Sequence, residues 1–155
     1  MRITDIIHDA LIKLALVAAN EPYRLTVDKT NQIITFQVGD LPAAAGVCVF
    51  EDEDSTLQVI NECIKRCTPK VARNVDTCRM VAGYDYELIS IIRALNDAAP
   101  LSCMMDVEVR ADGRVHIEWD NSAAVTTALT TLPHNPMRAL CFVFRNLLNH
   151  KRTTA

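Results

Sequence analysis

The best candidates in this sequence for residues that act together in catalysis are a histidine and a glutamate on two predicted strands. His116 faces Glu108 across a predicted hairpin, where the carboxylate would orient the imidazole as a general base. Together with the acidic run 51–54 and with His8 or His134, the pair would suit a small hydrolase or a metal-dependent enzyme. Cross-strand His–Glu pairs on a wet sheet face are more often ordinary surface pairs, and the sequence places no nucleophile beside this one. We therefore keep this enzyme as the alternative hypothesis.

Cysteines and acidic residues offer little further chemistry. Cys63 and Cys67 fall one helical turn apart and Cys78 follows, but this is not the spacing of a zinc knuckle, and no fourth ligand is close in sequence. Free cysteine is among the most buried residue types, so we expect reduced and mostly buried thiols. The run 51–54 lacks the alternation and the glycine of a calcium loop, and indicates a solvated loop before a helix. We predict no catalytic residue, no metal ligand and no cofactor.

Length and charge limit the remaining function classes. A chain of 155 residues with 50% hydrophobic residues fits one folded domain, placed at 1–150, with a flexible tail at 151–155. The net charge of −3 and the scattered basic residues disfavour a nucleic-acid groove. The apolar run 14–19 is too short for a membrane span or an export signal, so we expect no membrane association and a cytoplasmic protein.

The clearest predicted element is a helix that runs into a β-hairpin between residues 84 and 120. Asp85 would cap this helix after Gly83, and Pro100 prevents its continuation. A three-residue loop at 111–113, with Gly113 at positive φ, keeps the apolar residues of both strands on one side. The helix stripe is Leu88, Ile91, Ile92 and Leu95, and the hairpin pairs are Val109 with Val115, Val107 with Ile117 and Met105 with Trp119.

The other elements are predicted in the same way, from apolar residues that recur every three to four positions in a helix and every second position in a strand. We predict helices at 3–19 and 55–67 (the second from a Ser55–Gln58 capping box), a hairpin at 23–38, a strand at 46–50 and a last helix capped by Asn135. The first hairpin should pair Tyr23 with Val38, Leu25 with Phe36 and Val27 with Ile34 around a four-residue loop, 29–32. A strand around 57–59 stays open, residues 69–83 are unassigned or hold a short helix, and 121–132 is expected to be a crossing or loose helical segment.

These elements predict an α+β domain with an antiparallel sheet of about five strands, in the order α-β-β-β-α-(α)-β-β-α. Because the strands have one dry and one wet side, the helices should cover one face of the sheet only. Helix followed by hairpin occurs twice, at 3–38 and 84–120, but the residue identities do not align and the hairpin loops differ. From the sequence we therefore infer no repeat.

In its order of elements the chain resembles the class I type III secretion chaperones, and more closely the YbjN-type family of sensory-transduction regulators. The similar stretches are ITDIIHDAL leading into YRLTV and IITFQV, then GVCVF, then ELISIIRALNDA running into MMDVEVRADGRVHIEW, and a closing helix. The resemblance implies a compact α+β domain, usually dimeric, that binds protein segments on its surface and has no catalytic residues. The segment 51–83 is longer and more polar than the family pattern.

Apolar residues outside the expected core carry the leading functional hypothesis. Met104 precedes the second hairpin, and Phe142 and Val143 lie off the main stripe of the last helix, so we predict these three as partner-binding residues. Sheet edges offer a second route, by strand addition. We thus expect a non-enzymatic interaction domain, chaperone-like or regulatory, that binds a protein or peptide partner and forms a homodimer, with no nucleic-acid partner.

Overall fold

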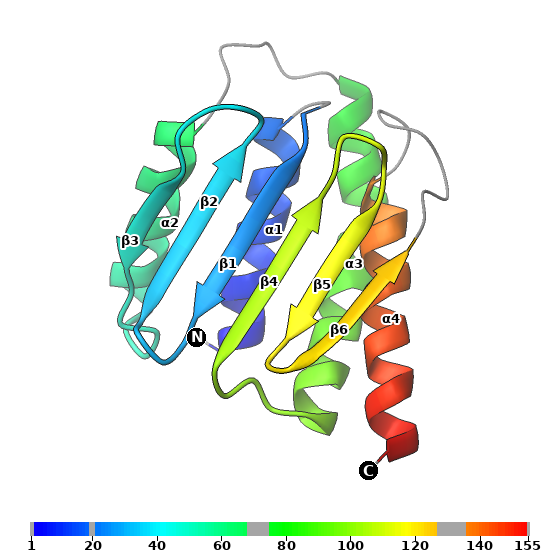
Figure 1. Cartoon of the computed structure of the whole chain (residues 1–155). Coiled ribbons are helices and arrows are strands. Elements are labelled where there is room, and N and C mark those ends of the chain that lie inside the picture. The colour runs from blue at the N-terminus through cyan, green and yellow to red at the C-terminus, as the bar shows by residue number, and fades with distance from the viewer. Residues whose placement is uncertain (1, 19–20, 68–74, 127–135, 155) are drawn as a thin grey trace.

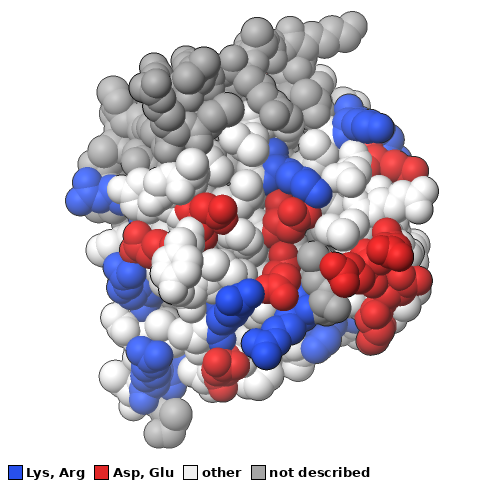
Figure 2. Space-filling model, turned by 180° about the vertical axis from the view of Figure 1, so that it is seen from behind, with Lys and Arg blue, Asp and Glu red and all other residues white. Residues whose placement is uncertain are grey.

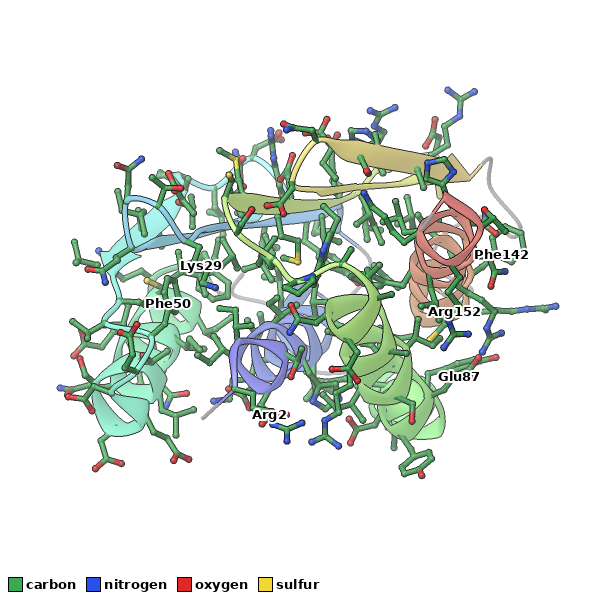
Figure 3. All side chains as sticks on the ribbon, turned by 90° about the horizontal axis from the view of Figure 1, so that it is seen from below. Arg2, Lys29, Phe50, Glu87, Phe142 and Arg152 are labelled. Carbon is green, nitrogen blue, oxygen red and sulfur yellow. The ribbon has the colours of Figure 1, made fainter. Side chains whose placement is uncertain are left out.

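One antiparallel sheet with helices on a single face makes up the part of the chain that the structure describes (Figure 1). The structure is a computed structural model, and it describes residues 2–18, 21–67, 75–126 and 136–154, without the side chains of 75–80, 125–126, 136 and 154. The described elements, in chain order, are α1 Ile3–Ala18, β1 Tyr23–Asp28, β2 Ile33–Val38, β3 Ala44–Val47, α2 Glu53–Cys67, α3 Val75–Ala98, β4 Met104–Val109, β5 Val115–Trp119, β6 Ser122–Thr126 and α4 Pro136–Thr154. The strands lie side by side in the order β3-β2-β1-β4-β5-β6. The expected α+β class with a one-sided helical cover is therefore confirmed (Figure 3).

Both predicted hairpins have the expected register. β1 pairs with β2 through Tyr23–Val38, Leu25–Phe36 and Val27–Ile34, around a loop at residues 29–32. β4 pairs with β5 through Met105–Trp119, Val107–Ile117 and Val109–Val115, and Gly113 has a φ of 85°. The alternation of apolar residues specified these registers, because a slip of one residue would turn every apolar side chain towards water.

The third strand and the helix after it differ from the prediction. β3 is Ala44–Val47 rather than 46–50, since Cys48 and Phe50 turn into the core. α2 begins at Glu53, two residues before the predicted start, because Asp52 is its cap and accepts a hydrogen bond from Ser55 N at 3.2 Å. The strand left open around 57–59 is helical.

Three differences from the prediction concern the second half of the chain. α3 is one helix of 24 residues that runs through Gly83, so Asp85 lies inside it and does not cap it. Glycine weakens a helix by about 1 kcal/mol, but the packing of α3 on α1 and α4 outweighs this cost. Residues 122–126 form β6 and not a helical segment, while 127–132 lie outside the described residues, as does the predicted cap Asn135. α4 continues to Thr154, which takes residues 151–154 of the expected tail into the helix.

The two halves of the chain repeat the same unit, α-β-β-β-α, and meet where β1 pairs with β4. The buried stripe Ile7, Ala10, Leu11 and Leu14 of α1 has the spacing of Leu88, Ile91, Ile92 and Leu95 of α3. Gly39 and Asp120 hold equivalent turns: each follows the second strand of its half, with a φ of 54° and 53°. Each also donates its backbone N–H to the carbonyl at the start of the first strand, Gly39 to Pro22 and Asp120 to Met104. The structure therefore shows a repeat that the residue identities hide.

Candidate interaction surface

The groups proposed for catalysis are not assembled in the described structure. Glu108 and His116 are paired in register as predicted, but Glu108 bonds Arg110 at 3.1 Å, and the carboxylate nearest His116 Nε2 is that of Glu118, at 3.6 Å. His8 lies on α1, in the helical layer, and pairs with Asp85 of α3. The acidic run 51–54 opens α2 at the far flank of the sheet, and His134 is outside the described residues. The described side chains include no group of three or more His, Cys, Asp or Glu that could hold a metal ion.

The cysteines lie mainly in the core, as expected. Cys48, Cys63, Cys67 and Cys141 are buried, whereas Cys103 is exposed, and the side chain of Cys78 is not described. Burial raises the pKa of Cys48 to about 11, with the nearby Cys63 adding to the effect, and burial raises that of Cys141 to about 12. Because the thiolate is the reactive form, these buried thiols are poor nucleophiles.

The open face of the sheet carries a paired charge network at its centre. Asp106 accepts hydrogen bonds from Arg24 Nε at 2.9 Å, from Arg24 Nη2 at 2.8 Å and from Thr26 Oγ1 at 3.0 Å. The hydrogen bond with Asp106 raises the pKa of Arg24 against the opposing effect of burial. A shallow hollow of about 270 Å³ adjoins this pair, lined partly by Gln37 and Glu108. The two parallel hydrogen bonds from Arg24, with the third from Thr26, thus satisfy the buried carboxylate of Asp106.

One border of the open face is apolar. The register places Val47 beside Ile33, Ile33 beside Asp28, and Asp28 beside Met104, in one row across four strands. Val47 is 69% exposed and Met104 is 43% exposed. Asp28 turns its carboxylate to its own loop, where it accepts hydrogen bonds from Asn31. We call Val47, Ile33 and Met104 the apolar row.

The three predicted partner-binding residues divide between surface and core. Met104 and Phe142 are each 43% exposed, whereas Val143 is fully buried. The assignment of Val143 to a binding surface is therefore corrected, because α4 packs on both α3 and the sheet and buries a wider arc than one stripe. Sequence reasoning missed four more exposed hydrophobic residues among those described, of which Tyr86 is 84% exposed; the others are Leu41, Val47 and Val49. Tyr86 could have been found, since it lies off the buried stripe of its helix.

The β3 edge of the sheet is capped by a side chain at one of its outward carbonyl groups. Cys48 N bonds Gln32 O, so the alternation of an antiparallel ladder turns the peptide groups of Ala45 and Val47 outward. The Arg66 side chain of α2 donates to the Ala45 carbonyl at 3.1 Å, which removes an outward acceptor from this edge. A four-residue strand capped by a cation is a protected edge.

The β6 edge has no such protection among the described residues. Asp120 N bonds Met104 O and Arg110 N bonds Arg114 O, so Val115, Ile117 and Trp119 direct their peptide groups to β6. It follows that Ala123 and Val125 present their N–H and C=O groups outward. β6 contains neither a charged residue nor proline, and Ala123 is exposed. This is the kind of edge that accepts another strand.

Phe142 lies close to this edge. α4 packs against β5 and β6, and Figure 3 places Phe142 on the outer flank of α4, away from α1 and α2. A strand added beside β6 would extend the dry face of the sheet over this flank. Phe142 and the outward groups of Ala123 and Val125 therefore define the candidate site, which we call the β6 site.

No protein-family model, no curated protein and no solved structure matches this chain. The resemblance to secretion chaperones and YbjN-type proteins thus stays a prediction. Of the helices in the described ranges, none has the length and apolarity that a membrane crossing requires.

Proposed function

We propose that this chain is a non-enzymatic protein-interaction domain, chaperone-like or regulatory, which captures an extended segment of another protein at the β6 site. The observation that carries the proposal is the difference between the two sheet edges. Arg66 caps an outward carbonyl of β3, whereas no described side chain caps the outward groups of Ala123 and Val125 on β6, beside the exposed Phe142. A captured strand would gain main-chain hydrogen bonds from β6 and pack one apolar side chain on Phe142. Four buried free thiols suit a reducing compartment, and we propose a cytoplasmic location.

The expected homodimer belongs to the same proposal but not to the same surface. Self-pairing of β6 would bring together two α4 helices that each contain four Lys or Arg residues and no Asp or Glu, and like charges repel. We therefore assign the dimer to the apolar row. Sedimentation velocity across micromolar concentrations tests this: Val47→Asp with Met104→Asp should give monomers, and a wild-type chain that is a monomer throughout would contradict the dimer.

Strand capture is tested with a neutral probe, a ten-residue peptide in which valine alternates with glutamine. Its binding should slow amide hydrogen exchange at Ala123 and Val125, whose N–H groups are not used by β5. Ala123→Pro removes one outward donor without breaking the β5–β6 ladder, and should abolish this protection. Ala45→Pro makes the same change on the β3 edge and is the matched control. Equal loss of binding in both variants, or none in either, would exclude β6 as the capture edge.

A further inference from the structure

Glu118 of β5 differs from the two carboxylates of β4 on the open face of the sheet. Asp106 and Glu108 each accept a hydrogen bond from an arginine side chain. Glu118 accepts none from any described residue, and its ion-pair partner, His116 Nε2 at 3.6 Å, is a cation only when the imidazole is protonated. Arg24 lies close enough for the charge of Glu118 to act on it, but both of its hydrogen bonds go to Asp106. The Glu118 side chain is also 48% exposed, so it is available to a cation from outside the described chain.

The register of the sheet places Glu118 next to the β6 edge. Glu118 pairs with Ala123 of β6, and the row continues inward through Asp106 and Thr26. Residues that lie directly opposite one another in a sheet share a face, so Glu118 and Ala123 both point to the open side, from which Figure 1 is seen. Ala123 is exposed and contributes only a methyl group to this row. Its side chain therefore leaves Glu118 accessible from the outer side of β6.

A strand added beside β6 would bring another side chain into the same row. The residue opposite Ala123 would share its face and lie two strand spacings from Glu118, roughly 10 Å between the Cα atoms. Arginine and lysine lay their aliphatic stems along apolar groups while the charged head stays in water. A basic residue at this position would thus cross the methyl group of Ala123 and pair its head group with Glu118.

The neighbours of that residue in the added strand would point to the other side of the sheet, towards α4, because successive side chains alternate across a strand. On this side lies Phe142, which is 43% exposed. α4 contains four Lys or Arg residues and neither Asp nor Glu, and Figure 2 shows Lys and Arg along the flank where α4 lies. An apolar side chain suits this side of an added strand, and a basic one does not.

We propose that the segment captured at the β6 site contains an arginine or lysine between two apolar residues, with the cation on Glu118 and the apolar side chains on the Phe142 side. This proposal rests on strand capture at β6 and specifies the chemistry of the partner. A single exposed ion pair adds little affinity, so its effect is to select among segments and to fix the register of the captured strand.

Fluorescence anisotropy with three labelled peptides tests the preference. Each is the ten-residue valine–glutamine peptide, with its third glutamine kept or replaced by arginine or glutamate. The valines can then face α4 while the altered residue faces Glu118. In 50 mM NaCl the arginine peptide should bind about threefold more tightly than the glutamine peptide, as expected for one exposed ion pair, and the glutamate peptide should bind most weakly. In 500 mM NaCl the three should bind alike.

Substitutions at Glu118 identify the residue that selects the basic segment. Glu118→Gln should remove the preference for arginine, and Glu118→Lys should reverse it, so that the glutamate peptide binds most tightly. Glu62→Gln and Glu62→Lys make the same changes in net charge at an exposed residue of α2 and should leave the order of the peptides unchanged. Unchanged binding of the glutamine peptide shows that the β6 edge is intact in each variant. Equal effects at both positions would mean that overall charge selects the peptide, and would overturn the proposal.

The failure of this inference can be told apart from the failure of the proposed function. If Ala123→Pro abolishes binding of all three peptides but the arginine and glutamine peptides bind equally to wild type, strand capture holds and the basic preference is wrong. If the arginine peptide is preferred but Ala123→Pro has no effect, the cation binds without strand addition, and both the proposed register and the proposed function are wrong. No binding of any peptide at millimolar concentration would also contradict both.

Discussion

The two halves of this protein share an architecture but end differently at the rims of the sheet. In the first half a five-residue turn, 39–43, leads to the short strand β3, and Arg66 caps its edge. In the second half Asp120 and Asn121 alone connect β5 to β6, and the described residues place no charged side chain on that edge. The comparison teaches that a repeated unit can keep the same fold in both copies while, among the described residues, a side chain caps the outer strand of only one of them.

The largest expected effect is the loss of stability on truncating a buried aromatic residue, and this change also tests whether the two halves share one core. Trp119 is fully buried in the second half, and its Nε1 donates to Ala99 O at 2.8 Å, which ties the end of α3 to β5. Trp119→Ala should lower the free energy of unfolding by about 3–5 kcal/mol, as should Phe36→Ala in the first half. Urea unfolding followed by circular dichroism measures both.

If β1 and β4 join the halves into one cooperative unit, each variant keeps a single transition. Two separated transitions in either variant would show that the halves unfold independently, and the comparison would then concern two small domains.

A second change tests how α2 closes the β3 edge. A Cβ at Gly46 would collide with Val59 Cγ1, so Gly46→Ala forces the Val59 side chain, or α2 with it, to move away from β3. We expect a loss of about 1–3 kcal/mol, typical of overpacking, measured by thermal or urea unfolding. Adding Val59→Ala removes the clashing methyl groups and should recover most of the loss. A Gly46→Ala variant as stable as wild type would mean that α2 does not hold this edge.

Alternation predicted the fold where apolar residues are large and regularly spaced. The registers of both hairpins, the one-sided cover and the stripes of α1 and α3 follow from this spacing alone. β6 was missed because Ser122, Ala123 and Ala124 are small and give no contrast between faces. The sequence predicts too late a start for α3, because Gly83 has a low helix propensity that tertiary packing outweighs.

Only part of the candidate site could be predicted from the sequence. Met104 is predicted as an adaptable methionine and Phe142 as an apolar residue off the stripe of its helix, and both are exposed. The rule used for Phe142 fails at Val143, which a second packing partner buries. The β6 edge could not be predicted, because β6 itself was not predicted as a strand.

A smaller loss of stability is expected from substitutions at the turn after β5, where Asp120 stands in the place that Gly39 has in the first half. Asp120 holds a positive φ where the first half has Gly39, and its carboxylate accepts hydrogen bonds from the backbone N–H groups of Ser102, Cys103 and Met104. Burial raises the pKa of Asp120, but these hydrogen bonds outweigh it, and the pKa lies below its ordinary value of 3.8. A lowered pKa means that the stabilisation is complete above that value and is lost as the pH falls through the folded-state pKa.

Asp120→Asn should therefore cost about 1 kcal/mol at pH 7, because a largely exposed carboxylate is screened by solvent. The difference from wild type should shrink as the pH falls below 4, as urea unfolding at several pH values would show. Asp120→Gly copies the first half: it relieves the backbone but loses the hydrogen bonds, so it should show the same pH dependence. A difference from wild type that is constant between pH 7 and pH 3 would be inconsistent with a role for the charge.

The smallest change in stability is expected for substitution of Arg66, the residue that makes the β3 edge different from the β6 edge. Arg66 is exposed, and Arg66→Ala should alter the free energy of unfolding by only about 0.5 kcal/mol. It uncovers the carbonyl of Ala45, however, so β3 should then accept the neutral valine–glutamine peptide, as we propose for β6. Hydrogen exchange at Ala45 and Val47 would report the new pairing, with Lys65→Ala as the matched control. If Arg66→Ala leaves β3 unable to bind while β6 still does, the cap is not what distinguishes the edges, and the length of the strand is: four residues against five.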